Sequence, residues 1–186
     1  MATTPNRLRV FGLIALMVQE FGIVEGRTRM QKLVYLANLI GWNCLQDFRF
    51  HHFGPFSDSL TEAIGEMRNL GWVHEMARPT TGGNVAYEYS VEGGRESMVN
   101  SLVSRVDDQI LVTKTQGLFH QLENFSSDQL ELMASLVFLR TTEHLLGEEL
   151  ISRTHELKPR FTVDEVRDGL RIFGIMGNFV PDLRNH

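Results

Sequence analysis

The chain of 186 residues contains a single cysteine, Cys44, and this scarcity excludes disulfide-stabilised proteins. One cysteine cannot form an internal disulfide, and small secreted domains usually depend on such bonds. A chain of this length can bury a hydrophobic core without a disulfide or a bound metal. We therefore expect a cytoplasmic location and a buried, structural thiol at Cys44.

The sequence also lacks an apolar run of roughly 18 residues, the length that a membrane-spanning helix needs. An apolar stretch does follow Arg7 and Arg9, as in a signal peptide. However, Gln19 and Glu20 end it at once, and its apolar residues recur at helical spacing. These features predict a first core helix over residues 7–20 and no association with a membrane.

A basic surplus is missing as well, because the formal net charge is -5. Non-specific binding to nucleic acid comes largely from the neutralisation of phosphates by Lys and Arg. The composition therefore disfavours a general nucleic-acid binder, although a local patch can still form. The candidate patch consists of Arg7, Arg9, Arg27, Arg29, Lys32 and Arg78.

Residues 29–41 predict a helix that is apolar on two sides, as is typical of the central helix of a bundle. A short aromatic strand is expected over residues 48–53, and Gly54-Pro55 should end it. Ser57 then caps a third helix that runs to about Asn69 and is closed by Gly71. The apolar residues of this third helix that we expect to be buried are Leu60, Ile64, Met67 and Leu70.

Two extended segments, residues 72–77 and 85–91, flank a tip rich in Pro and Gly and predict a β-hairpin. Three helices followed by such a hairpin are typical of a winged helix, a variant of the helix-turn-helix. The predicted class is therefore α+β and mainly helical, with a winged-helix-like module over residues 1–92. Residues 93–186 should form a helical extension packed on that module.

Within the helical extension, Val99, Leu102, Val106 and Ile110 lie on one face of a single expected long helix. Ser126 should begin a buried helix, and Thr162 with Glu165 predicts a capping box before the last one. The tail over residues 175–180 is apolar and needs cover. Homodimerisation and packing on the chain's own core are the two explanations for it.

The segment RMQKLVYLANLIGW, followed by FRFHHFGPFSDSLTEAIGEMRNLGWV, resembles the YwgA-like proteins and the related Panacea (SocA-like) domains. DQLELMASLVFL and LKPRFTVDEVRDGLRIFG resemble later blocks of the YwgA-like group. The resemblance implies a winged-helix-like module with a helical extension. It also implies an antitoxin-like or adaptor-like role through binding of a partner protein. It supplies no catalytic residues, and Phe53 stands where tyrosine is more familiar.

Two sets of residues are candidates for recognition. Gln31, Tyr35, Asn38 and Trp42 fall on one stripe of the second helix, which suits a partner-binding surface or a boundary covered by other helices. His51, His52 and Ser57 surround the start of the third helix, where free N–H groups favour anions. The second set can equally form a structural corner.

No cofactor motif, no metal-ligand pattern and no catalytic constellation appears in the sequence. His144 and Glu148 lie one helical turn apart, but no third ligand follows in a familiar pattern. We therefore expect a non-enzymatic module that binds another protein. The alternatives are a winged-helix transcriptional regulator on DNA and a sensor or enzyme with a small-molecule pocket between the two parts. The acidic third helix, with Asp58, Glu62 and Glu66 against Arg68, argues against DNA.

Overall fold

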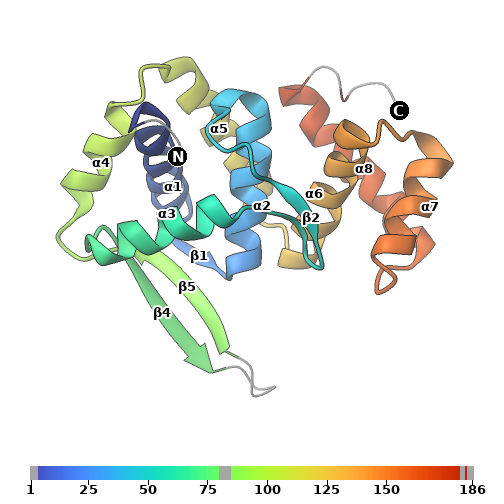
Figure 1. Cartoon of the computed structure of the whole chain (residues 1–186), viewed down its shortest axis with the longest axis horizontal. Coiled ribbons are helices and arrows are strands. Elements are labelled where there is room, and N and C mark those ends of the chain that lie inside the picture. The colour runs from blue at the N-terminus through green and yellow to red at the C-terminus, as the bar shows by residue number, and fades with distance from the viewer. Residues whose placement is uncertain (1–3, 80–84, 181–182, 184–186) are drawn as a thin grey trace.

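The computed structural model describes residues 4–79, 85–180 and 183, and it is an α+β protein in which helices dominate (Figure 1). The first part contains α1 (Thr4–Phe21), β1 (Ile23–Glu25), α2 (Arg27–Ala37), a π-helical turn (Asn38–Trp42), β2 (Arg49–His51), β3 (Gly54–Phe56), α3 (Asp58–Asn69), β4 (Val73–Pro79) and β5 (Val85–Val91). The second part contains α4 (Glu96–Ser104), α5 (Gln109–Leu122), α6 (Ser127–Thr142), α7 (Gly147–Leu157) and α8 (Val163–Phe179).

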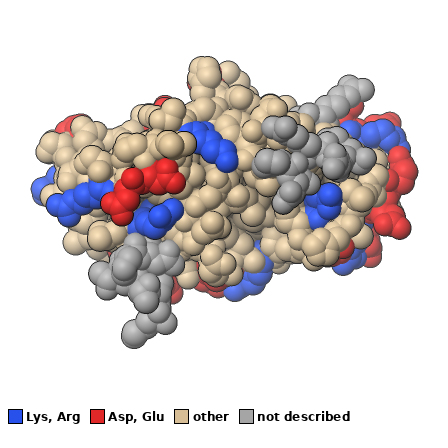
Figure 2. Space-filling model, turned by 90° about the horizontal axis from the view of Figure 1, so that it is seen from above, with Lys and Arg blue, Asp and Glu red and all other residues tan. Residues whose placement is uncertain are grey.

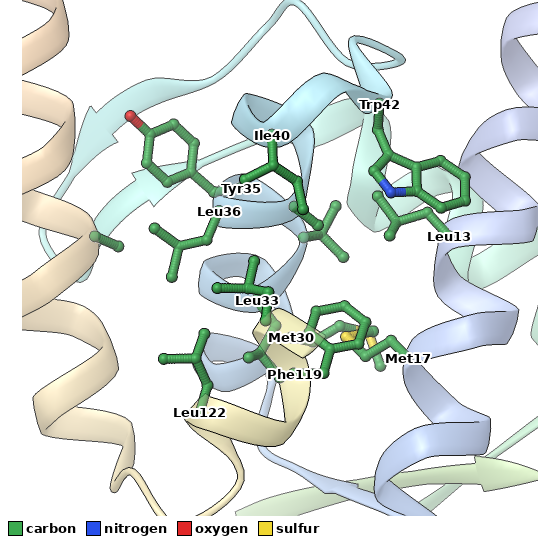
Figure 3. Packing of buried hydrophobic residues seen from close by; sticks show 14 of the residues in the cluster. Leu13, Met17, Met30, Leu33, Tyr35, Leu36, Ile40, Trp42, Phe119 and Leu122 are labelled. Carbon is green, nitrogen blue, oxygen red and sulfur yellow. The ribbon is translucent and has the colours of Figure 1, made fainter. Parts of the chain in front are cut away.

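Helix α2 lies at the centre of the molecule, as its two apolar sides predict. Residues 29–37 are all buried, and the helix contacts α1, α5 and α6. Figure 3 shows Leu33 and Leu36 within this core, with Tyr35 directed away from the side occupied by Leu13 and Trp42. Burial of side chains of this size stabilises a fold by roughly 1.5–3 kcal/mol each.

The helix that we expected over residues 29–41 begins two residues earlier, at Arg27, and its α-helical part ends at Ala37. Its last turn, Asn38–Trp42, is π-helical, and Gly41 adopts a φ of 134° that an α-helix does not permit. The Asn38 side chain helps to fix the exit of the chain, because its Oδ1 accepts hydrogen bonds from the backbone N–H groups of Cys44 and Leu45. This local hydrogen bonding competes with continuation of the helix.

The predicted hairpin is confirmed, since β4 pairs antiparallel with β5 from Val73↔Val91 to Pro79↔Val85. The short strand β1 adds to the other side of β5, which gives the order β1-β5-β4. We did not predict β1, because three residues are too few to show a periodic pattern. The hairpin projects from the helices in Figure 1, and its expected tip over residues 80–84 lies outside the described residues.

The prediction of one strand over residues 48–53 ended by Gly54-Pro55 is wrong. These residues form a second hairpin, in which β2 pairs with β3 and His51 faces Gly54. Gly54 has a φ of 81°, so it can make the tight return that places Pro55 within β3 instead of after it.

The start of α3 is confirmed, because Ser57 Oγ accepts a hydrogen bond from the backbone N–H of Leu60. Gly71 follows the helix with a φ of 64°, as expected for a C-terminal cap. Leu60 and Met67 are buried and Ile64 is partly buried. Leu70, which we expected in the core, is exposed because it lies beyond the last helical residue, Asn69.

The expected long helix through Val99 and Ile110 is two helices, α4 and α5. Asp108 begins the second one, because its side chain accepts a hydrogen bond from Leu111 N. This new start turns Ile110 outward, and 83% of the residue is exposed. The helix α7 was not predicted at all.

Two other predictions for the helical extension are confirmed. Ser126 with Gln129 forms a capping box at the start of the buried helix α6, and Thr162 with Glu165 forms one at the start of α8.

The apolar tail packs against its own chain: Met176 is buried, and Phe179 and Val180 are partly buried against the core. No helix in the described part of the chain is both long and apolar enough to span a membrane.

Candidate functional site

The stripe that we considered for partner binding is buried, so it forms no exposed surface. Gln31, Tyr35, Asn38 and Trp42 all lie in the interior. Gln31 exchanges two hydrogen bonds of 3.0 Å with the backbone of Ser57. Trp42 Nε1 donates to Thr115 Oγ1 at 2.7 Å. The stripe is therefore a boundary covered by other elements, the second of the two readings.

The anion at the start of α3 is a side chain of the protein itself, the carboxylate of Asp47. The Asp47 carboxylate accepts hydrogen bonds from Ser57 Oγ at 2.6 Å and from Ser59 N at 2.9 Å. Burial opposes ionisation of Asp47, but these hydrogen bonds outweigh it and lower its pKa. His51 and His52 are exposed. Among the described contacts, neither imidazole ring forms a hydrogen bond with Ser57. The expected anion site is thus already filled.

The six residues of the candidate basic patch do not form one surface. Lys32 and Arg29 are buried, and Arg29 donates hydrogen bonds to the backbone carbonyls of Leu122, Glu123 and Phe125 at the end of α5. Burial lowers the pKa of Arg29, and the charge of Glu25 opposes that shift. These two cations hold the interior together and cannot contact a phosphate backbone.

The remaining members of the patch have partners within the protein. Arg7 pairs with Glu66, and Arg78 pairs with Glu88 at 2.8 Å. Arg9 lies over the Trp42 ring, and Arg27 lies over the Tyr87 ring. On the face shown in Figure 2, basic side chains lie beside acidic ones in small groups. Neutral surface separates these groups from one another. These six residues therefore do not present the continuous positive surface that we expected of a DNA contact.

A cluster of buried charges holds the β2–β3 hairpin against the helices. Lys32 Nζ donates to the carbonyl of Pro55 at 2.6 Å, and Lys158 Nζ donates to the carbonyls of His51 and His52. Lys158 also pairs with Glu131 at 3.0 Å, and Arg160 pairs with the same carboxylate at 2.9 Å. Burial lowers the pKa of Lys32 to about 7. We name Lys32, Glu131 and Lys158 the buried charge cluster. Arg160 reaches it from the surface, because 43% of its side chain is exposed.

Cys44 is buried, as expected from the sequence, and burial raises the pKa of its thiol to about 12. A thiol in this state is a poor nucleophile at neutral pH. In the described residues, no group of three or more His, Cys, Asp or Glu side chains is placed to hold a metal ion.

One candidate site is a pocket between α3 and the β4–β5 hairpin, with a cavity volume of about 300 Å³. We call it the α3–hairpin pocket. It is lined by Arg27, Gln31, Phe56, Thr61, Ile64, Gly65, Arg68, Glu75 and Tyr89. Figure 1 shows α3 next to the base of the β4–β5 hairpin, the two elements that border the pocket.

Two arginines in this pocket converge on one carboxylate. Arg68 pairs with Glu75 at 2.7 Å, and Arg27 lies 3.6 Å from the other oxygen of that carboxylate. Tyr89 donates its hydroxyl proton to Glu75 at 2.7 Å and accepts from Arg27 Nε at 3.2 Å. Burial opposes ionisation of Glu75, but Tyr89, Arg68 and Arg27 together lower its pKa. The carboxylate is therefore ionised, and the local charge is one positive.

Of these residues, only Arg27 was a candidate from the sequence, and its grouping with Arg68, Glu75 and Tyr89 was not predicted. One signal was available, because alternation places Glu75 on the same face of the hairpin as Val73 and opposite Tyr89. A charged residue on the inward face of a strand needs a partner. The sequence could not show that the partners come from α2 and α3.

A second, polar hollow lies between the two parts of the chain, with a cavity volume of about 620 Å³. It is bordered by Glu20, Glu25, Arg29 and the segment from Glu123 to Ser127. Arg29 is already engaged by backbone carbonyls there. The lining contains no base placed beside a nucleophile among the contacts that the structure describes.

Comparison with known proteins gives one informative relative. The chain is 27% identical over 150 residues to Uncharacterized protein YwgA of Bacillus subtilis, which covers 81% of this chain and 86% of that protein. This similarity supports a YwgA-like family. No protein-family model and no solved structure matches the chain. The relation to Panacea (SocA-like) domains stays a prediction from the sequence motifs.

Proposed function

We propose that this YwgA-like protein is a non-enzymatic module that binds another protein and regulates it, in an antitoxin-like or defence-associated role. The observation that carries the proposal is the charge of α3 and its surroundings. The exposed face of α3 bears Asp58, Glu62 and Glu66, and the nearby cations Arg7 and Arg49 are paired with two of these carboxylates. Such a surface has no surplus of positive charge for phosphates and suits a protein partner.

The architecture supports a winged-helix origin for the recognition surface. Apart from the π-helical turn and the β2–β3 hairpin between α2 and α3, the chain order α1, β1, α2, α3, β4, β5 and the strand order β1-β5-β4 resemble those of a winged helix, with β4–β5 in the place of the wing. We propose that the protein keeps this frame and uses it for protein recognition. The buried thiol of Cys44 is compatible with a reducing cytoplasm, which we propose as its location.

A DNA-binding regulator is the second candidate, and only the winged-helix order favours it. We do not favour it, because Arg29 and Lys32 are buried and the other cations have partners. A small-molecule sensor is the third candidate, and the polar hollow between the two parts would be its site.

Affinity purification of the tagged protein from its own host tests the proposal. We expect a stoichiometric partner protein that reassembles with the purified chain in size-exclusion chromatography. The absence of such a partner, together with salt-dependent shifts of genomic DNA fragments at low salt, would favour the transcriptional regulator instead.

A further inference from the structure

We propose that the α3–hairpin pocket is the docking site for an acidic peptide segment of the partner protein, with a carboxylate held between Arg27 and Arg68 and an apolar side chain beside it. The inference rests on the proposed function, and it adds the location of the contact and the chemistry of the partner. Three observations carry it: the charge of the pocket, its apolar wall and the glycine on α3.

The charge of the pocket is suited to one more carboxylate. Arg27 and Arg68 share a single counter-ion, Glu75, and only 13% of that side chain is exposed. The arginine side chains remain 57% and 49% exposed, respectively, so their guanidinium groups are accessible from solvent. A guanidinium presents five N–H donors in a plane that matches a carboxylate. A second carboxylate would neutralise the remaining positive charge.

The wall of the pocket offers apolar contact next to those donors. Phe56, Ile64 and the ring of Tyr89 line it. Arg27 is held in place by stacking on Tyr87, with 3.7 Å between its Cζ and the ring centroid. A stacked guanidinium loses less side-chain entropy when it binds a ligand, because the surroundings already fix its position.

Gly65 leaves the α3 side of the pocket open. Glycine in the interior of a helix costs about 1 kcal/mol relative to alanine. A Cβ at this position would meet no atom within 4 Å, so packing inside the protein gives no reason for the glycine. Glycine is the residue that permits close approach of a ligand to the backbone, and Gly65 borders this pocket.

The acidic residues on the neighbouring face of α3 favour a peptide over a nucleic acid as the ligand of the pocket. Asp58, Glu62 and Glu66 follow each other at four-residue spacing, so they share a face beside the pocket. A DNA backbone would bring phosphates against both the arginines and these carboxylates. A peptide can place one carboxylate in the pocket and keep its other charges away from this stripe.

The test uses random short peptides displayed on phage and selected against the immobilised full-length chain. We expect the selected peptides to be enriched in Asp or Glu next to an apolar residue. A labelled copy of a selected peptide is then measured by fluorescence anisotropy. Gly65→Leu, which fills the pocket without removing a contact, and Arg68→Glu, which reverses one charge, should each weaken binding by about tenfold or more.

Matched controls lie on α8. Gly174 is a helical glycine where a Cβ would also meet nothing within 4 Å, so Gly174→Leu makes the same change elsewhere. Arg167 is 49% exposed and paired with Asp164, like Arg68 with Glu75, so Arg167→Glu reverses an equivalent charge. Both control variants should bind the peptide as the natural chain does.

Each contrary outcome overturns the inference in a recognisable way. Selected peptides that bind Gly65→Leu undiminished would place the contact elsewhere and leave the interaction function standing. Failure to enrich any sequence, or enrichment without acidic residues, would refute the acidic peptide. A short labelled DNA duplex that binds the chain and loses binding in Gly65→Leu would assign the pocket to nucleic acid and would count against the proposed function as well.

Discussion

The molecule contains two antiparallel hairpins of opposite character. The β2–β3 hairpin is anchored along one side: backbone carbonyls of its residues accept hydrogen bonds from Lys32 and Lys158, and its strand β3 lies against α2 and α6. The β4–β5 hairpin projects outward, and its charged side chains pair with each other or with α2 and α3 at the surface. The two hairpins therefore use charge for different purposes.

The difference shows how the context of a charge decides its role. In the buried charge cluster, the ions are removed from water and must be paired completely to be tolerated. In the α3–hairpin pocket, two half-exposed arginines share one carboxylate, so donors remain accessible. The first arrangement is suited to holding the two parts of the chain together, and the second is suited to binding.

The largest expected effect comes from breaking the buried charge cluster. Glu131→Gln leaves Lys158 and Arg160 without their shared carboxylate, and both Glu131 and Lys158 are only 2% exposed at their side chains. We expect a loss of about 3–5 kcal/mol in the free energy of unfolding, measured by urea denaturation. The matched change in the other hairpin, Glu88→Gln, should cost less than about 1 kcal/mol. Equal losses would remove the distinction between the hairpins.

Two glycines should respond with opposite signs. Gly54 has a φ of 81°, and a Cβ there would lie 2.7 Å from Ser135 Oγ. Gly54→Ala should therefore lower the free energy of unfolding by about 2–3 kcal/mol. Gly65→Ala should raise it by up to about 1 kcal/mol, because the helix gains a better helix-forming residue and the new methyl group meets nothing. Thermal denaturation of both variants checks the pair, and a destabilised Gly65→Ala variant would contradict the open pocket.

The pH dependence of stability should report on Lys32. Its pKa falls from 10.5 to about 7 on folding, so above pH 7 the unfolded chain binds more protons than the folded one. Lys32 alone should then make the free energy of unfolding rise with pH, by at most about 1.4 kcal/mol per pH unit. Cys44 should oppose this rise from about pH 9.0 upward, because the unfolded thiol ionises there while the folded one stays protonated.

The variant Lys32→Met should reduce this slope between pH 7 and 9, measured by urea denaturation at several pH values. Burial lowers the pKa of Lys158 too, so part of the slope should remain. The level of stability is a poor readout here, because a well-packed apolar replacement for a buried charge is often neutral or stabilising. An unchanged slope would show that Lys32 keeps its charge throughout this range.

The smallest expected effect concerns the anion at the start of α3, between the two hairpins. Asp47→Asn should cost about 1 kcal/mol, because the carboxylate that accepts from Ser57 and Ser59 is lost. Hydrogen bonding lowers the pKa of Asp47, so its contribution is present above the unfolded pKa of 3.8 and disappears as the pH falls through the folded value. The difference between the variant and the natural chain should therefore shrink in acid. If the stability difference between Asp47→Asn and the natural chain persists in acid, the cause is packing and not the charge of the carboxylate.

Several features of the fold follow from short-range chemistry that the sequence displays directly. The capping residues Ser57, Ser126 and Thr162 begin helices where expected, since a side-chain oxygen three residues before a free N–H is a local arrangement. The two apolar sides of residues 29–41 indicated a central helix. Two extended segments that flank a tip rich in Pro and Gly indicated the projecting hairpin.

The sequence by itself therefore determined the class, the central helix and the projecting hairpin, because these depend on periodicity and caps. Only the tertiary structure decided which polar residues face solvent. Lys32 and Tyr35 lie on the same helix, and both are buried because β3 and α6 cover them. The meeting of Arg27, Arg68 and Glu75 depends on three elements packing together, and no local pattern encodes that distance. For this reason the sequence predicted a recognition surface on α2, whereas the structure has its candidate site in the pocket between α3 and the hairpin.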